Sequence, residues 1–221
     1  MTSPPFPSPN RSVSRCALRG ALLAVAVAST TVAARAQFDL QFTIDDPLDK
    51  FTIEQEEILQ DALVHAEAMW EGVIVGYPEG VSVPSVNIEI RPASGGLAAA
   101  NFTSSTVHDG IRFATAGFIQ MNPAFIESFA TGMDPDGNFN TGFNYIDELM
   151  AHEAGHVLGV GTLWDDNDAY EHNSFQFTGE FALAAYQAEF DATATTVPVE
   201  DAGSGGTQNS HWDQLMRSSS Q

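Results

Sequence analysis

Two histidines, His152 and His156, are four residues apart, and a glutamate, Glu153, stands between them. On an α-helix this spacing places two side chains on one face, about 6 Å apart along the axis, so both imidazoles can bind one metal ion. Glu153 would lie beside the ion without being a ligand, where it can take a proton from water. With six histidines in 221 residues, chance gives only about 0.01 matches to this pattern, so an accidental match is disfavoured.

The residues around these histidines predict a helix over 144–158 that ends soon after the second histidine. Asn144 can cap its start, and Gly159 can end it in a left-handed turn. Asp147 and Glu148 fall in the first turn, where carboxylates suit the helix dipole. The apolar residues of this segment recur at helical spacing. They are Tyr145, Ile146, Leu149, Met150, Val157 and Leu158.

A site with two histidines is incomplete, because catalytic zinc usually has three protein ligands and an open position. In the longer pattern H-E-x-x-H-x-x-G-x-x-H a third histidine follows the glycine. Here Gly159 is present, but Thr162, a poor ligand, occupies the third position. The remaining histidines are His65, His108, His172 and His211. His65 falls in an expected helix, His108 in a polar loop at 104–110 and His172 after an acidic run. Ligand chemistry alone leaves the choice open.

The segment 152–164, His-Glu-Ala-Gly-His-Val-Leu-Gly-Val-Gly-Thr-Leu-Trp, resembles the active-site segment of the leishmanolysin-like metallopeptidases, particularly their bacterial relatives. In that family an insertion separates the glycine from the third zinc histidine, and Ser210-His211-Trp212 is similar to the segment that carries it. Weaker similarities lie at 38–40, 68–71, 197–200 and in the Gly-rich turn at 203–207. The resemblance implies a metzincin-like fold, a zinc ion held by His152, His156 and His211, and Glu153 as the catalytic base.

The sequence departs from the family pattern in two ways. Family members place a methionine in a turn beneath the zinc, and here Met216 follows His211 by only five residues. Either Met216 serves in a shortened turn, or the end of the chain is altered. Leishmanolysins are also rich in disulfides and are held latent by a propeptide cysteine. The single cysteine, Cys16, falls in the expected targeting segment, so neither feature applies.

Residues 1–36 have the organisation of a secretory signal peptide. Arg11, Arg15 and Arg19 precede an apolar run at 21–28, and Ala34-Arg35-Ala36 offers a small-residue cleavage site. The run is far shorter than the roughly 20 residues that span a bilayer, so stable membrane insertion is not expected. The sequence predicts an extracellular or periplasmic protein with one metallopeptidase domain at 37–221.

The chain is strongly acidic, with a formal net charge of −21. Four of its eight basic residues and none of its acidic residues lie in 1–36, so removing this segment lowers the net charge by four, to −25. Such a surface repels nucleic acids and anionic membranes. The expected partner is a protein or peptide substrate, and the sequence does not indicate an oligomeric state.

Two acidic stretches raise calcium as a second metal. Residues 134–140, Asp-Pro-Asp-Gly-Asn-Phe-Asn, resemble the first half of a calcium loop, but no glutamate follows at the twelfth position, counting Asp134 as the first. Asp165-Asp166-Asn167-Asp168 is the other run. Each stretch is interpreted as a solvated turn, with Ca²⁺ binding as the alternative.

The remaining patterns predict an α+β fold with a twisted mixed sheet, the active-site helix and a smaller C-terminal subdomain. The N-terminal subdomain would comprise 37–159, and the C-terminal subdomain, with the third ligand, 160–221. The segment 96–101 is the candidate edge strand for pairing with a peptide substrate. Strands are expected at 38–44, 86–90 and 117–122, and further helices at 54–72 and 178–190.

Together these features predict a secreted zinc metalloendopeptidase that hydrolyses peptide bonds with activated water and Glu153 as general base. The alternative is a non-catalytic exported module for binding or adhesion with a vestigial metal site, which the unusual C-terminus supports. The intact Glu153 favours the enzyme, because a purely structural metal site needs no general base.

Overall fold

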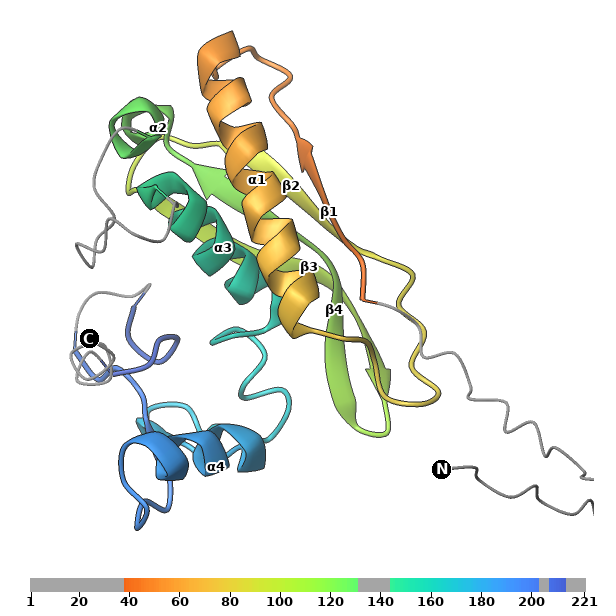
Figure 1. The fold of residues 1–221 in the computed structure, drawn as a ribbon, viewed down its shortest axis with the longest axis vertical. Helices are drawn as coiled ribbons and strands as arrows, with labels where there is room; N and C mark the ends of the chain where they lie inside the picture. The colour runs from red at the N-terminus through yellow and green to blue at the C-terminus, as the bar shows by residue number, and fades with distance from the viewer. Residues whose placement is uncertain (1–37, 131–143, 203–206, 214–221) are drawn as a thin grey trace, which may run out of the picture. The chain divides into compact units, whose positions relative to one another are not determined.

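The computed structural model describes residues 38–130, 144–202 and 207–213 (Figure 1). The expected signal peptide at 1–36, the segment 134–140 that resembles part of a calcium loop, Met216 and most of the Gly-rich turn at 203–207 lie outside the described residues. What the sequence suggests for these segments stays a prediction.

A four-stranded mixed sheet forms the centre of the fold (Figure 1). Its strands are β1 (Leu40–Ile44), β2 (Val86–Pro92), β3 (Ala98–His108) and β4 (Ile111–Met121), in the order β1-β2-β4-β3. β2 is parallel to both β1 and β4, whereas β3 is antiparallel to β4. The prediction of a mixed sheet in an α+β protein is confirmed.

Two long helices, α1 (Ile53–Val73) and α3 (Tyr145–Leu158), pack together on one face of the sheet, and the short helix α2 (Pro123–Ala130) follows β4 (Figure 1). Their apolar faces form one core with the sheet, and its fully buried members include Leu59, Ile88, Ile90, Ile119, Ile146 and Met150. Burial of one such side chain contributes about 1.5–3 kcal/mol. This core therefore holds α3, the predicted active-site helix, firmly against the sheet.

The prediction of a polar loop at 104–110 is wrong. Residues up to His108 continue β3, and Asp109 and Gly110 form a two-residue turn that leads into β4 at Ile111. Both turn residues have positive φ, 50° and 82°, the backbone that an Asp-Gly pair favours in a tight hairpin. The dipeptide is thus a hairpin signal, and the strand expected at 117–122 is only the last part of β4.

Residues 160–213 form a smaller region with little regular structure. Its described residues contain one helix, α4 (Glu180–Glu189), and a pair of short strands, β5 (Gln176–Phe177) and β6 (Val197–Pro198). A separate, largely aromatic cluster holds it together: Trp164, Tyr170, Phe177, Val197 and Val199, with Trp212 packed against them. We call the described residues of 38–158 the sheet region and those of 160–213 the C-terminal region.

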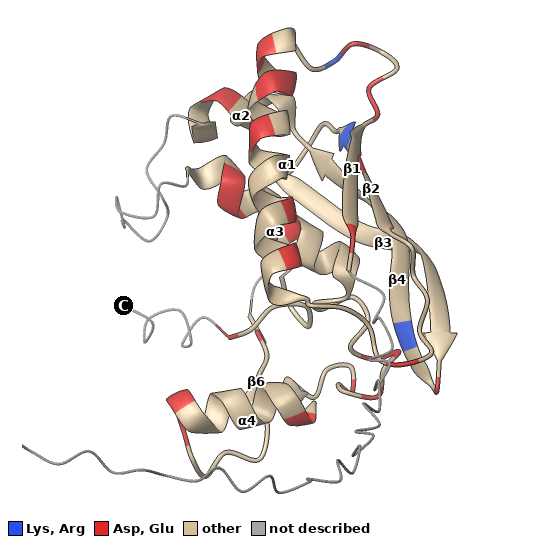
Figure 2. Cartoon of the chain, turned by 45° about the vertical axis from the view of Figure 1, so that its right-hand side comes forward, with Lys and Arg blue, Asp and Glu red and all other residues tan. Residues whose placement is uncertain are grey.

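Acidic residues occur on each of the described helices (Figure 2). The described residues include only three basic ones, Lys50, Arg91 and Arg112. The negative charge of the composition therefore lies on the folded part of the chain. Among the described helices, none is long and apolar enough to cross a membrane.

Candidate metal centre

The helix α3, which carries the first two histidines, is fixed at both ends. The Asn144 side chain accepts hydrogen bonds from the N–H groups of Ile146 and Asp147, both at 3.1 Å, and the Asp147 carboxylate accepts one from the Asn144 N–H, also at 3.1 Å. This reciprocal cap pairs donors that a helix start otherwise leaves unsatisfied. Gly159 has φ 116° and ends the helix in the left-handed conformation. Both predicted helix ends are confirmed.

Trp70 of α1 fixes α3 close to the two histidines. Its indole N–H donates to the Ala151 carbonyl at 2.9 Å. A Cβ atom on Gly155 would lie 2.9 Å from the Trp70 ring, closer than van der Waals contact allows. Packing against Trp70 therefore explains why the residue just before His156 is glycine.

The ring of His156 is oriented by the turn that follows α3. Its Nδ1 lies 2.8 Å from the Val160 carbonyl. Because a carbonyl only accepts hydrogen bonds, Nδ1 carries the proton and Nε2 carries a lone pair. Burial lowers the pKa of His156, although the bond to Val160 opposes this shift, so the ring is held neutral, as a metal ligand requires. Thr162, at the place of a third ligand in the longer pattern, instead donates its hydroxyl to the His156 carbonyl at 2.5 Å.

His211 comes from the C-terminal region, whose backbone packs against the chain just after α3. Gly161 has φ 79°, and a Cβ atom there would lie 2.2 Å from the Ser210 carbonyl oxygen. Only glycine permits this approach, so Gly161 is a site residue whose role the H-E-x-x-H pattern does not indicate. The Nδ1 of His211 lies 3.0 Å from the Thr207 carbonyl, which again leaves Nε2 with the lone pair.

The structure brings the Nε2 atoms of three histidines together. The distances are 3.0 Å for His152–His211, 3.1 Å for His152–His156 and 3.1 Å for His156–His211. Because the Nδ1 atoms of His156 and His211 bind carbonyl groups, their Nε2 atoms are the ones that face each other and can share a cation. Nitrogens bound to one zinc ion at about 2.0–2.1 Å lie at most about 4.2 Å apart, and all three pairs meet this limit. The three histidines can therefore bind a metal ion, and they are the one group of three or more such ligands among the described residues.

The other three histidines lie outside this cluster. Each has a ring nitrogen beside a carboxylate: His65 at 3.1 Å from Asp147, His108 at 3.3 Å from Asp109 and His172 at 3.4 Å from Asp165. Of the four candidates for the third ligand, the structure thus brings only His211 to the pair on α3.

A cleft of about 520 Å³ opens beside the three histidines, and Glu153, His156 and His211 line it. One wall consists of Leu97 and the first residues of β3, 98–100. β3 is an edge strand, paired within its sheet only with β4, so the prediction of an edge strand near 96–101 is confirmed from Ala98 onward. The alanine side chains leave room for an extended chain to approach this edge.

Glu153 is 6% exposed. Burial raises the pKa of its carboxyl group to about 7. A carboxyl group that titrates near neutrality can both accept and release a proton during a reaction. Among the described residues that line the cleft, none is a lysine or arginine that would pair with it.

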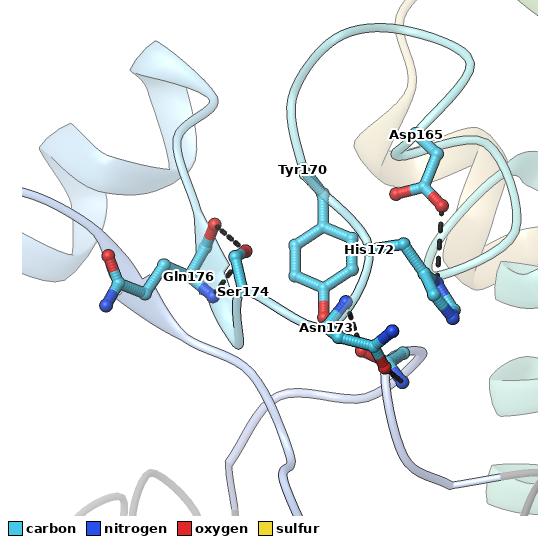
Figure 3. Close-up of polar contacts among 7 residues, drawn as sticks. Asp165, Tyr170, His172, Asn173, Ser174 and Gln176 are labelled. Atoms are coloured by element: carbon cyan, nitrogen blue, oxygen red, sulfur yellow. Dashed lines mark hydrogen bonds and ion pairs between the residues drawn. The ribbon is translucent and has the colours of Figure 1, made fainter.

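The acidic run 165–168 is tied to its neighbours. Figure 3 shows His172 turned toward the carboxylate of Asp165. Asp166 lies 3.6 Å from Nε of Arg112, and the Asn167 side chain binds both the N–H and the carbonyl of Arg112, at 2.7 and 3.1 Å. Within the described residues this run forms no group of three His, Cys, Asp or Glu ligands, so calcium binding by it stays a prediction.

No protein-family model matches the chain, and the comparison with curated proteins gives no match. The resemblance to leishmanolysin-like peptidases therefore stays a prediction, carried by residues 152–164 and 210–212.

Proposed function

We propose that this chain is a secreted zinc endopeptidase of the leishmanolysin-like, metzincin type. The observation that carries the proposal is the convergence of three Nε2 atoms within 3.1 Å of one another, next to the buried carboxyl group of Glu153. A surface helix that carried two histidines by accident would need neither a third histidine from 55 residues farther along the chain nor a buried acid.

The donor set favours zinc over calcium or magnesium. Three neutral imidazoles and no carboxylate ligand suit Zn²⁺, whereas calcium and magnesium take oxygen ligands. Zinc bound there would polarise water and the scissile carbonyl group.

The residues of the chain supply the proton transfers and the substrate position. Glu153 takes a proton from the attacking water and delivers it to the leaving amine, and its raised pKa suits both steps. The peptide lies extended along the free edge of β3, where main-chain hydrogen bonds hold the scissile bond beside the histidines.

Zinc content and peptide hydrolysis test the proposal together. Purified chain lacking residues 1–36 should contain about one zinc ion and hydrolyse fluorescently labelled casein. Glu153→Gln should keep the zinc and lower hydrolysis by about 10²–10⁴-fold, because the ligands remain while the base is removed. Glu148→Gln, on the same helix but outside the cleft lining, is the matched control and should remain active. Zinc binding without hydrolysis by the wild type would instead support the non-catalytic binding module.

A further inference from the structure

The turn before His211 determines the orientation of its ring. The Ser210 N–H donates to the Thr207 carbonyl at 3.3 Å and closes a turn over residues 207–210. The same carbonyl accepts a hydrogen bond from Nδ1 of His211. The third residue of this turn, Asn209, has φ 68°. Asparagine and glycine adopt this left-handed backbone with least strain. The conformation of Asn209 therefore decides where the Thr207 carbonyl points.

The Asn209 side chain makes three hydrogen bonds to the loop 170–173. Its Oδ1 accepts hydrogen bonds from the Tyr170 hydroxyl and, at 3.0 Å, from the Asn173 N–H, and its Nδ2 donates to Asn173 Oδ1 at 3.2 Å. Its backbone N–H donates to the Glu200 carbonyl at 3.1 Å. Tyr170 and Asn173 lie close together in Figure 3, on the loop that also carries His172.

Tyr170 is a firm anchor for these bonds. It is 5% exposed, belongs to the aromatic cluster and packs its ring edge-on against Trp164 at 5.9 Å between centroids. Trp164 also contacts Trp212, the residue after His211, at 4.6 Å. The hydroxyl of Tyr170 thus reaches Asn209 from a position that the core of the C-terminal region fixes.

We propose that Asn209 is a positioning residue for the metal centre, through its left-handed backbone and its side-chain bonds to Tyr170 and Asn173. It holds the 207–210 turn so that the Thr207 carbonyl orients the His211 ring and directs Nε2 toward the other two histidines. The inference rests on the metal site of the proposed function, but it does not require hydrolysis. In this arrangement the loop 170–173 supplies no metal ligand itself but positions the third ligand, His211.

Two substitutions separate the side-chain bonds from the backbone conformation. Asn209→Gly keeps access to positive φ but removes all three side-chain bonds, and Tyr170→Phe removes one hydroxyl and keeps the buried ring. Each should speed zinc dissociation into a chromophoric chelator about 10-fold, the lower end of losses for groups that orient metal ligands. Asn209→Asp keeps the acceptor Oδ1 and should therefore release zinc at a rate close to that of the wild type. Tyr186→Phe is the matched control, because Tyr186 packs against the same cluster from α4, and it should dissociate zinc at the wild-type rate.

A second measurement distinguishes positioning from a loss of general stability. The visible spectrum of the Co²⁺-substituted protein reports ligand geometry, and it should change in Asn209→Gly and Tyr170→Phe but not in Tyr186→Phe. Wild-type dissociation rates and unchanged Co²⁺ spectra in both variants would overturn the inference, even if they unfold at lower urea concentrations. Wild type that binds zinc but fails to hydrolyse casein would overturn the proposed enzyme and leave the inference standing. Wild type that binds neither Zn²⁺ nor Co²⁺ would overturn both.

Discussion

The sheet region and the C-terminal region each contribute to the metal centre in a different physical way. His152 and His156 stand on a helix of 14 residues that is capped at both ends and packed on a core of fully buried aliphatic side chains. His211 stands in a turn of the C-terminal region, whose single described helix has no buried residue. There His211 is held by the close approach of Gly161 to Ser210, by aromatic packing of the neighbouring Trp212 and by the side-chain hydrogen bonds of Asn209. The first region would hold its ligands without the metal, whereas the second depends on a few local contacts.

Removing one ligand from each region should have the largest effect. His156→Ala and His211→Ala should each lower zinc affinity by about a thousandfold, because one of three protein ligands is lost. In metal-free protein the two variants should differ in their free energy of unfolding. His156→Ala leaves the part-buried Val160 carbonyl without its donor and should lower the free energy of unfolding by about 1–3 kcal/mol, whereas His211→Ala should change it little. Competition with a chelator and urea unfolding of metal-free protein measure the two quantities.

His172→Ala is the control for the ligand variants, since His172 lies beside Asp165 and outside the cluster. Zinc affinity that fell more for His172→Ala than for His211→Ala would show that the assignment of the third ligand is wrong.

The same contrast explains how far the sequence predicts this molecule. The spacing of His152 and His156 is a property of the helix itself, so the pair, the cap at Asn144 and the end at Gly159 follow from local rules. Strands β1 and β2 follow from alternation of apolar residues for the same reason. The full length of β3 does not, because its outer half, where exposed and half-buried residues mix, is too polar to show that pattern.

The position of His211 cannot be derived from local rules. Its contact with the first two histidines depends on the close approach of Gly161 to Ser210, and no local pattern in the sequence indicates that these two residues meet. Only the family resemblance favours His211 over the other candidates, and no periodicity indicates it. Asn209 gives a weak local signal as a residue that tolerates positive φ, but its partners Tyr170 and Asn173 are more than 30 residues away.

The buried carboxyl group of Glu153 should lower the stability of the sheet region at neutral pH. Its pKa rises from 4.5 in the unfolded chain to about 7 in the fold, so the folded state binds the proton more tightly. The free energy of unfolding should therefore fall as pH rises from about 4.5 to about 7. In metal-free protein, Glu153→Gln should remove this slope, match the wild type near pH 4.5 and be more stable at pH 8 by up to about 3 kcal/mol. Urea unfolding across this pH range measures the difference.

Added zinc provides the check on that interpretation. A cation next to Glu153 favours the ionised carboxylate, so the advantage of Glu153→Gln at pH 8 should shrink when zinc is bound. An advantage that is equal at pH 4.5 and pH 8 would show that burial of the charge is not its cause.

Removing the metal should loosen the turn that carries His211 and leave local openings at the hairpin end of the sheet unchanged. With free zinc at a hundred times its Kd, binding stabilises the folded site by about 2.7 kcal/mol. Amides whose opening releases the ion should therefore exchange their hydrogens about a hundredfold faster after chelation. We expect this for residues 207–213, which hold His211 through local bonds, and not for the β3–β4 turn at 109–110, whose local opening leaves the ion bound. Hydrogen–deuterium exchange with and without chelator, resolved by peptide, measures both regions in one sample. Equal acceleration in the β3–β4 turn and in 207–213 would mean that the two regions open as one unit and that the metal stabilises the entire chain.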